Sequence, residues 1–203
     1  TKLLKRLCWT IQNQRKRNKI RHMPYFCYTM KKEITKKEKY KELITYAIII
    51  ILIILIRTFI ITPVRVNGTS MDDTLKDKEI MLLNKFTYYF KDIKRFDIIV
   101  IDYENTKLIK RVIGLPGETL EYKNNKLYIN GKEQKETFLN QETEDFNIED
   151  LGYTKIPENC YFAIGDNRKD SLDSRVFGCF KKDQIKGKAN IVLFPLKNFG
   201  YKH

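Results

Sequence analysis

The stretch from Leu43 to Pro63, LITYAIIIILIILIRTFIITP, decides how the chain is organised, because it is apolar on all sides. Its one charged residue, Arg57, lies close enough to the end of the stretch for its long side chain to reach a membrane surface. A helix rises about 1.5 Å per residue, so this stretch would extend roughly 30 Å, the thickness of a bilayer core. We therefore predict a transmembrane helix over residues 43–63 rather than a buried helix of a soluble protein.

The charge on the N-terminal side of this stretch predicts its orientation. Residues 1–42 hold 14 Lys and Arg against three Glu, so +11 of the net charge of +14 lies there. The positive-inside rule then keeps residues 1–42 in the cytoplasm and places residues 64–203 outside the cell. A cleaved signal peptide is the alternative, with a shorter apolar core followed by a small-residue cleavage site. Residues 62–66, TPVRV, offer no such site, so we expect a retained anchor.

Residues 1–29 are basic and irregular, whereas Met30 is followed directly by a lysine-rich segment and the apolar stretch. Our hypothesis is that translation begins at Met30 and that residues 1–29 are upstream sequence or a disordered tail.

The net charge does not predict binding to nucleic acid, because only about +3 of it remains after residue 42. Trp9, Tyr25 and Phe26 are also too sparse to form a stacking platform for bases.

The remainder of the chain is predicted to be mainly β, because short runs rich in Ile, Val and Tyr are separated by turn residues. We expect strands at residues 79–83, 97–103, 108–113, 119–122, 126–129, 161–164 and 189–194. Asn124-Asn125 and Asn130-Gly131 favour hairpin turns. Residues 133–156 are polar and acidic, and we expect them to form a surface excursion.

The cysteines and histidines limit the possible chemistry. The chain has four cysteines without a C-x-x-C pair, and two histidines, so we expect no metal site. Cys160 and Cys179 would form a disulfide outside the cell, with two unpaired thiols as the alternative. We do not expect a Ser-His-Asp triad, because His22 precedes the apolar stretch and His203 is the last residue, so neither is well placed to serve a site outside the membrane. The base of a serine hydrolase would have to be a carboxylate, a lysine or a metal-bound water.

Three short segments concentrate residues suited to catalysis or to tight turns. They are residues 68–75 (GTSMDDTL), 110–118 (KRVIGLPGE) and 165–175 (GDNRKDSLDSR). Each segment alone has the composition of an ordinary turn or loop. In this order, after an apolar stretch, they resemble the conserved boxes of type I signal peptidase, also called leader peptidase. Residues 96–100 (FDIIV) resemble the intermediate strand box, so the resemblance covers residues 43–195.

This resemblance implies a signal-peptidase-like β fold, outside the cytoplasm, on one N-terminal transmembrane helix. The implied activity is a membrane-anchored serine endopeptidase that removes signal peptides from exported preproteins. It would cut after small residues of the Ala-x-Ala type, through an acyl-enzyme and without a cofactor. The implied partners are signal peptides and the lipid bilayer, near the protein-export channel and without nucleic acid. The implied location is a bacterial plasma membrane, with the N-terminus in the cytoplasm.

The family pattern assigns roles to individual residues. Ser70 would be the nucleophile, Lys110 the general base, and Ser171 would orient the Lys110 amine. The oxyanion would be held by the backbone N–H of Ser70. The supporting charge pairs would be Asp173 with Arg175 and Asp166 with Arg111, and the residues bordering the substrate cleft would be Met71 and Gly68.

Physical chemistry supports a lysine in this role. The ammonium of a solvated lysine has a pKa near 10.4, which makes its amine a poor base at neutral pH. Burial disfavours the charged form and lowers the pKa. Lys110 stands among Leu108, Ile109, Val112 and Ile113, which fits such a buried position.

Two positions depart from the family pattern. Asp73 stands where Pro is usual, which we expect to loosen the turn after the nucleophile. Phe96 stands where Gly is common, which we expect to affect packing only.

Two other functions are less consistent with the sequence. A self-cleaving Ser–Lys protease of the repressor type would be cytosolic, which the apolar stretch contradicts. A membrane-tethered binding protein with inactive boxes would not need Ser70, Lys110 and Ser171 intact.

Overall fold

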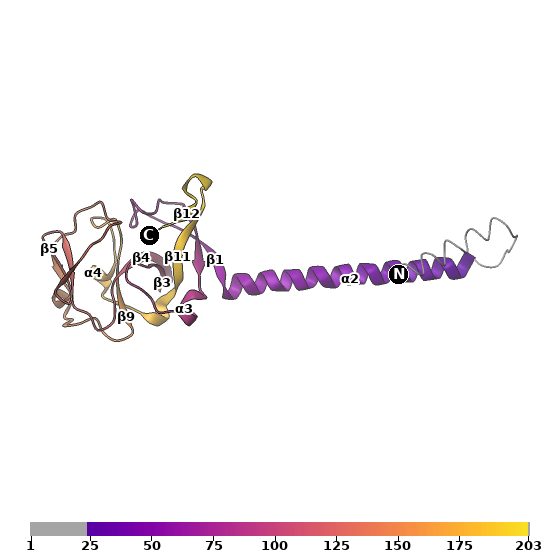
Figure 1. Cartoon of the computed structure of the whole chain (residues 1–203), viewed down its shortest axis with the longest axis horizontal. Helices are drawn as coiled ribbons and strands as arrows, with labels where there is room; N and C mark the ends of the chain where they lie inside the picture. The colour runs from indigo at the N-terminus through magenta and orange to yellow at the C-terminus, as the bar shows by residue number, and fades with distance from the viewer. Residues whose placement is uncertain (1–23, 203) are drawn as a thin grey trace. The chain divides into compact units, whose positions relative to one another are not determined.

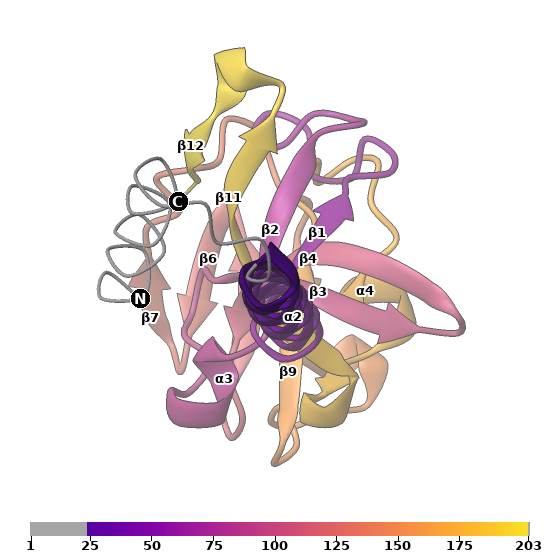
Figure 2. The same ribbon diagram turned by 90° about the vertical axis from the view of Figure 1, so that its right-hand side faces the viewer.

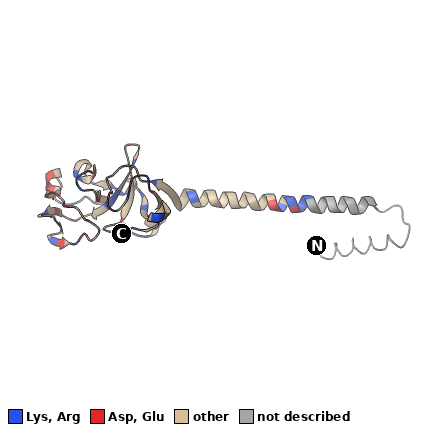
Figure 3. Cartoon of the chain, turned by 90° about the horizontal axis from the view of Figure 1, so that it is seen from above, with Lys and Arg blue, Asp and Glu red and all other residues tan. Residues whose placement is uncertain are grey.

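A computed structural model describes the backbone of residues 24–202 and the side chains of residues 36–202. The chain divides into two compact units, one up to Ile54 and one from Leu55 onward. Helix α2 (Pro24–Phe59) contains one segment, Lys36–Phe59, that is long and apolar enough to cross a membrane. Its described part has an uncharged stretch, visible in Figure 3, whose Leu and Ile side chains are exposed. Exposed apolar side chains of this density suit contact with lipid better than contact with water.

The helix differs from the predicted span at both ends. Residues 24–42, predicted as a separate tail, belong to α2, and residues 1–23 of that tail lie outside the described part of the chain. At the other end the helix stops at Phe59, and strand β1 (Ile61–Arg65) follows. The predicted end at Pro63 was therefore wrong. Pro63 cannot donate a helical hydrogen bond, and the β-branched residues around it favour an extended backbone.

The second unit contains two antiparallel sheets (Figure 1). The larger sheet has the strand order β1-β2-β11-β3-β4-β9-β10, and β12 pairs with β11. Figure 2 shows β1, β2 and β11 side by side. The strands after β1 are β2 (Ile80–Asn84), β3 (Ile98–Tyr103), β4 (Thr106–Gly114), β9 (Cys160–Ile164), β10 (Phe180–Lys181), β11 (Ile185–Phe194) and β12 (Gly200–Tyr201).

The smaller sheet has the order β7-β6-β5-β8. Its strands are β5 (Leu120–Lys123), β6 (Lys126–Ile129), β7 (Lys132–Gln134) and β8 (Phe146–Asn147). The predicted hairpin turns are confirmed, since Asn124, Asn125, Asn130 and Gly131 all have positive φ, as type I′ turns require.

The prediction for residues 133–156 was wrong in part. This segment contains β8 and the short helix η1 (Ile148–Leu151), and it buries Thr143 and Ile148 against the rest of the unit. The other short helices are α3 (Thr87–Phe90), α4 (Ser174–Phe177), η2 (Lys182–Gln184) and η3 (Leu196–Asn198).

The predicted mainly β fold is confirmed, and its core explains how the two sheets are joined. Leu120 and Leu127 of the smaller sheet share one buried cluster with Ile113 of β4 and with Phe162 and Ile164 of β9. A cluster of this size removes several apolar side chains from water, at about 1.5–3 kcal/mol each. The end of β9 is therefore fixed against both sheets, and the segment 165–175 begins there.

Candidate active site

Three segments far apart in sequence come together beside β4. Lys110 and Arg111 lie on β4, and Arg111 pairs with Ile164 of the antiparallel neighbour β9. The residues that follow Ile164 therefore run past Lys110. The turn containing Ser70 joins them, because Asn167 donates its backbone N–H to the Ser70 carbonyl at 3.1 Å. The resemblance predicted that these three boxes form one site, and the structure brings them together.

Lys110 is buried and makes a direct hydrogen bond within this group. Its side chain is 2% exposed, and its Nζ donates to Ser171 Oγ at 3.0 Å. Burial lowers the pKa of Lys110 from 10.5 to about 8, while the negative charge of Asp173 works in the opposite direction. A pKa of about 8 leaves roughly one tenth of the amine neutral at pH 7, far more than for a solvated lysine.

Ser171 is held in turn by Asp173. Its hydroxyl is among the groups whose hydrogen bonding lowers the pKa of the Asp173 carboxyl, and its Oγ accepts the hydrogen bond from Lys110. Asp173 also accepts from Arg175 Nη2 at 2.9 Å and from the Gly165 N–H at 3.0 Å. Burial alone would raise the pKa of Asp173, but the hydrogen bonds and charge of Arg175 outweigh it and lower the pKa. The predicted Asp173–Arg175 pair is present, and it keeps the carboxylate charged.

Gly165 brings Ser70 and Ser171 close to each other. A Cβ on Gly165 would overlap both the Ser70 carbonyl oxygen and Ser171 Oγ. Both serines therefore lie against the Cα of Gly165, in a space that no other residue would leave open. Ser70 itself is partly exposed, at the start of a turn in which the Leu75 N–H donates to the Met71 carbonyl at 2.8 Å.

The predicted Arg111–Asp166 pair is also present, and it is buried. Arg111 Nη2 lies 2.7 Å from Asp166 Oδ2, and Nη1 donates to the Phe96 carbonyl at 3.0 Å. The guanidinium also lies over the ring of Phe138, 3.8 Å from its centroid. Arg111 thereby links the segments of Phe96, Phe138 and Asp166 from a position without solvent.

The two residues predicted to border the cleft lie in different surroundings. Met71 is 1% exposed and packs in the core with Val66 and Leu75, so its side chain lies beneath the turn and not on an open surface. Gly68 is exposed with φ +88°, and its N–H donates to Asp77 Oδ1 at 2.9 Å.

Both departures from the family pattern occupy left-handed backbone. Asp73 has φ +77° and Phe96 has φ +67°. The expectation that Phe96 affects packing only was wrong, because a bulky residue at positive φ is strained and glycine is not. Its ring packs edge-on against Phe138, with centroids 5.2 Å apart. Asp73 accepts a hydrogen bond from Gln141 Nε2 at 3.3 Å.

Sequence analysis missed a cluster around Arg168. Its guanidinium reaches Glu136, Tyr122 and Thr143, all on or beside the smaller sheet. Arg168 belongs to the segment 165–175, but Glu136 lies in the segment predicted as a surface excursion. The only signal in the sequence was the arginine itself, because a buried guanidinium needs a carboxylate partner.

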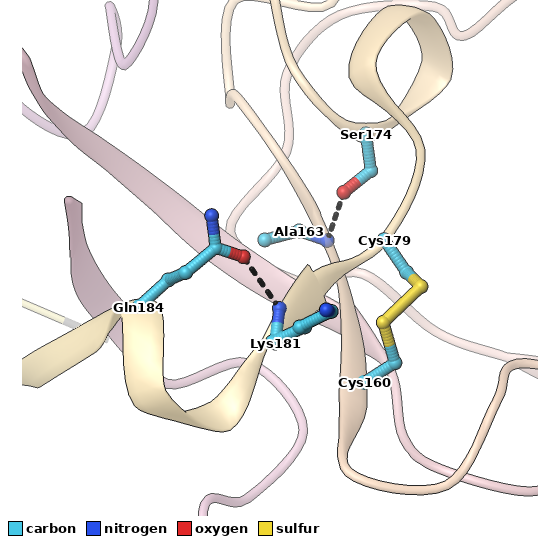
Figure 4. The surroundings of a disulfide bond; sticks show 6 residues. All are labelled: Cys160, Ala163, Ser174, Cys179, Lys181 and Gln184. Carbon is cyan, nitrogen blue, oxygen red and sulfur yellow. Dashed lines mark hydrogen bonds between the residues drawn. A yellow bond between two sulfur atoms is a disulfide. The ribbon is translucent and has the colours of Figure 1, made fainter. Parts of the chain in front are cut away.

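Cys160 and Cys179 form a disulfide and are not unpaired thiols. Their Cα atoms are 5.7 Å apart (Figure 4). Beside this bond, Ser174 Oγ accepts a hydrogen bond from the Ala163 N–H at 2.9 Å. The segment 165–175 is therefore enclosed by a covalent link between its flanking residues.

Comparison with known proteins shows relatives over most of the chain. Residues 40–194 match the family model described as signal peptidase, peptidase S26. A signal peptidase I of Bacillus amyloliquefaciens is 40% identical over 177 residues, which cover 82% of this chain and 96% of the relative. A signal peptidase I P of Bacillus subtilis subsp. natto is 42% identical over 175 residues, covering 81% and 95%.

Among solved structures, a signal peptidase I from Enterococcus faecalis is 40% identical and covers 48% of this chain and 97% of its own, with a TM-score of 0.46. The family match extends over more than half of the chain, from the apolar helix to the end of β11. The chain belongs to the signal peptidase family, peptidase S26.

Proposed function

We propose that this protein is a membrane-anchored signal peptidase I that uses Ser70 as nucleophile and Lys110 as general base. The observation that carries the proposal is the buried Lys110 amine, hydrogen-bonded to Ser171 beside the turn of Ser70. A neutral amine can take a proton from a serine hydroxyl, and burial is what makes the amine neutral near physiological pH.

In the proposed first step, Ser70 Oγ attacks the scissile carbonyl carbon while Lys110 Nζ takes the hydroxyl proton. The oxyanion is stabilised by the backbone N–H of Ser70. The Lys110 ammonium then gives its proton to the leaving amine, and the signal peptide remains esterified to Ser70. In the second step Lys110 removes a proton from water, and the water oxygen attacks the ester carbon. The Lys110 ammonium then returns the proton to Ser70 Oγ as the ester bond breaks, and the signal peptide leaves as its free acid.

Ser171 and Asp173 have an orienting role in this scheme. Ser171 directs its own proton to Asp173 and accepts a hydrogen bond from Lys110. The amine lone pair is then free to face the Ser70 hydroxyl. An aspartate orients the base in a Ser-His-Asp triad, and here a serine held by an aspartate would do so.

The substrate would be an exported preprotein with small residues, of the Ala-x-Ala type, before the scissile bond. It would bind extended, with backbone hydrogen bonds for affinity and shallow pockets for specificity. The apolar helix would hold the enzyme in a bacterial plasma membrane, with its N-terminus in the cytoplasm and its sheets outside, near the export channel. Ser70 follows the helix end at Phe59 closely, so the chain can extend at most about 40 Å between them.

Trapping the ester tests the proposed nucleophile. The purified enzyme would be mixed with an ester of an Ala-x-Ala peptide, quenched in acid and digested for mass spectrometry. We expect the acyl group on the peptide that contains Ser70, and no adduct with Ser70→Ala. An adduct on any other residue, or one that persists in Ser70→Ala, contradicts the assignment.

A further inference from the structure

Arg168 connects the segment 165–175 to the smaller sheet. Its Nε donates to the Gly165 carbonyl at 3.2 Å, and its Nη2 donates to Glu136 Oε1 at 2.6 Å. Its Nη1 donates to Thr143 Oγ1 at 2.7 Å and to the Tyr122 hydroxyl at 3.0 Å. The Arg168 and Glu136 side chains are 1% and 9% exposed. The guanidinium is therefore fixed at every nitrogen, and water does not compete for it.

Glu136 and Tyr122 complete this cluster from the side of the smaller sheet. The Tyr122 hydroxyl donates to Glu136 Oε1 at 2.9 Å while it accepts from Arg168. Tyr122 lies on β5, and Glu136 lies shortly after β7. Each of the three side chains thus bonds to the other two, so none can move without breaking contacts of both partners.

The backbone that Arg168 holds is the backbone against which both serines lie. Arg168 fixes the Gly165 carbonyl, and the Gly165 N–H donates to Asp173. The Cα of Gly165 touches the Ser70 carbonyl oxygen and Ser171 Oγ so closely that a Cβ does not fit. A shift of Gly165 would therefore displace Ser70, Ser171 and Asp173 together. A displacement of about 1 Å in catalytic geometry costs about a hundredfold in rate.

We propose that Glu136 and Tyr122 are positioning residues for signal-peptide cleavage, acting through Arg168 on Gly165. The smaller sheet would thereby set the distance between Ser70 and the amine of Lys110. The inference rests on the proposed function, because it assumes that Ser70 and Lys110 perform the chemistry.

A purely structural role for the cluster makes different predictions. A buried guanidinium that loses its carboxylate destabilises the fold, whereas replacing both partners by apolar residues of similar size restores stability. If the cluster only stabilises the unit, the double variant Glu136→Leu with Arg168→Met regains both Tm and kcat. If the cluster positions Gly165, this double variant regains Tm but keeps a low kcat, since nothing then donates to the Gly165 carbonyl from that side.

The experiment compares cleavage kinetics and Tm for Glu136→Gln, Tyr122→Phe and the double variant, in the full chain in detergent. Glu133→Gln is the matched control, because Glu133 pairs with Lys126 at 3.0 Å on the exposed surface of the same sheet. We expect kcat to fall about tenfold to a hundredfold with KM within about twofold, and the control to match the wild type. We also expect the acidic limb of the pH profile to move to higher pH, because a displaced loop admits water to Lys110.

Glu136→Gln should retain part of the activity, because its amide oxygen can still accept from Arg168. The proposal would be overturned if all three folded variants, Glu136→Gln, Tyr122→Phe and the double variant, kept the kcat and the pH profile of the wild type. A change in Tm alone would not rescue it. Ser70→Ala separates this failure from failure of the proposed function. If the wild type does not cleave, or Ser70→Ala does, the catalytic assignment fails and not the positioning role alone.

Discussion

The Lys110 side chain has lost nearly all contact with water, and this loss gives an amine the properties of a base near neutral pH. Desolvation is the largest influence on its pKa, and the nearby Asp173 limits the effect because its charge favours the ammonium. Ser171 separates the two groups and receives the Lys110 hydrogen bond. Desolvation outweighs the charge of Asp173, so the pKa of Lys110 is lowered to about 8 even though the Asp173 carboxylate lies nearby.

The pH dependence of cleavage should report this balance. Only the neutral amine accepts a proton, so kcat/KM should rise with pH and level off above about 8. Below that value it should fall about tenfold per pH unit. The check is kcat/KM measured from pH 5 to pH 10 with one peptide substrate. A kcat/KM that still rises tenfold per pH unit up to pH 10 would show that burial does not lower the pKa of Lys110 from its value of 10.5 in solvated lysine.

Gly165→Ala should abolish cleavage by steric overlap. The new methyl group would overlap the Ser70 carbonyl oxygen and Ser171 Oγ, which must then move apart. We expect kcat to fall by about a hundredfold or more. Gly152→Ala is a suitable control, because a Cβ there meets no atom within 4 Å although its φ of +80° adds strain. Wild-type kinetics for Gly165→Ala would contradict the close packing described for the site.

At the scale of elements, the turn after Ser70 excludes proline at position 73, although proline is the residue that the family pattern favours there. Asp73 has φ +77°, and the proline ring fixes φ near about −65°. Asp73→Pro should therefore lower the free energy of unfolding by more than about 1 kcal/mol. Asp73→Gly should change it by less than about 0.5 kcal/mol, because glycine adopts this φ without strain. Chemical denaturation of the two variants checks this, and a stabilising Asp73→Pro would contradict the turn geometry.

The disulfide should stabilise the segment that carries the orienting residues. Cys160 and Cys179 are 19 positions apart, and closing a loop of that length contributes about 3 kcal/mol. Reduction should lower Tm by roughly 10 °C for a unit of this size. The pairing of Tyr161 with Phe180 remains, so the fold should persist at low temperature. The measurement is Tm with and without a phosphine reductant. The double variant Cys160→Ser with Cys179→Ser should have the Tm of the reduced wild type in both conditions. An equal Tm for reduced and oxidised wild type would contradict this role.

At the scale of the whole molecule, the sequence predicts the elements whose signals are local. The alternating strands and the Asn-Asn and Asn-Gly turns depend on neighbouring residues, and the structure contains them. The helix end was misplaced because Ile61 and Val64 suit lipid and a sheet equally well. The backbone at Phe96 and the partner of Arg168 depend on distant segments, so no local pattern could reveal Glu136.

The candidate site could be predicted from the sequence only as far as its boxes resemble a family. That resemblance named the residues, and the structure adds their hydrogen bonds and their burial. It also shows that Met71, which is predicted to border the cleft, has a buried side chain. Gly165 was part of a quoted box, but its close approach to both serines follows from packing of segments that are far apart in sequence.

The most direct test of the account is cleavage of a preprotein with an Ala-x-Ala site by the detergent-solubilised full chain. Ser70→Ala, Lys110→Ala and Lys110→Arg would be assayed beside the wild type, with Tm confirming that each is folded. We predict mature-length product from the wild type and none from the three variants, since a guanidinium stays protonated and cannot replace the amine. Product from Ser70→Ala or from Lys110→Arg would contradict the account.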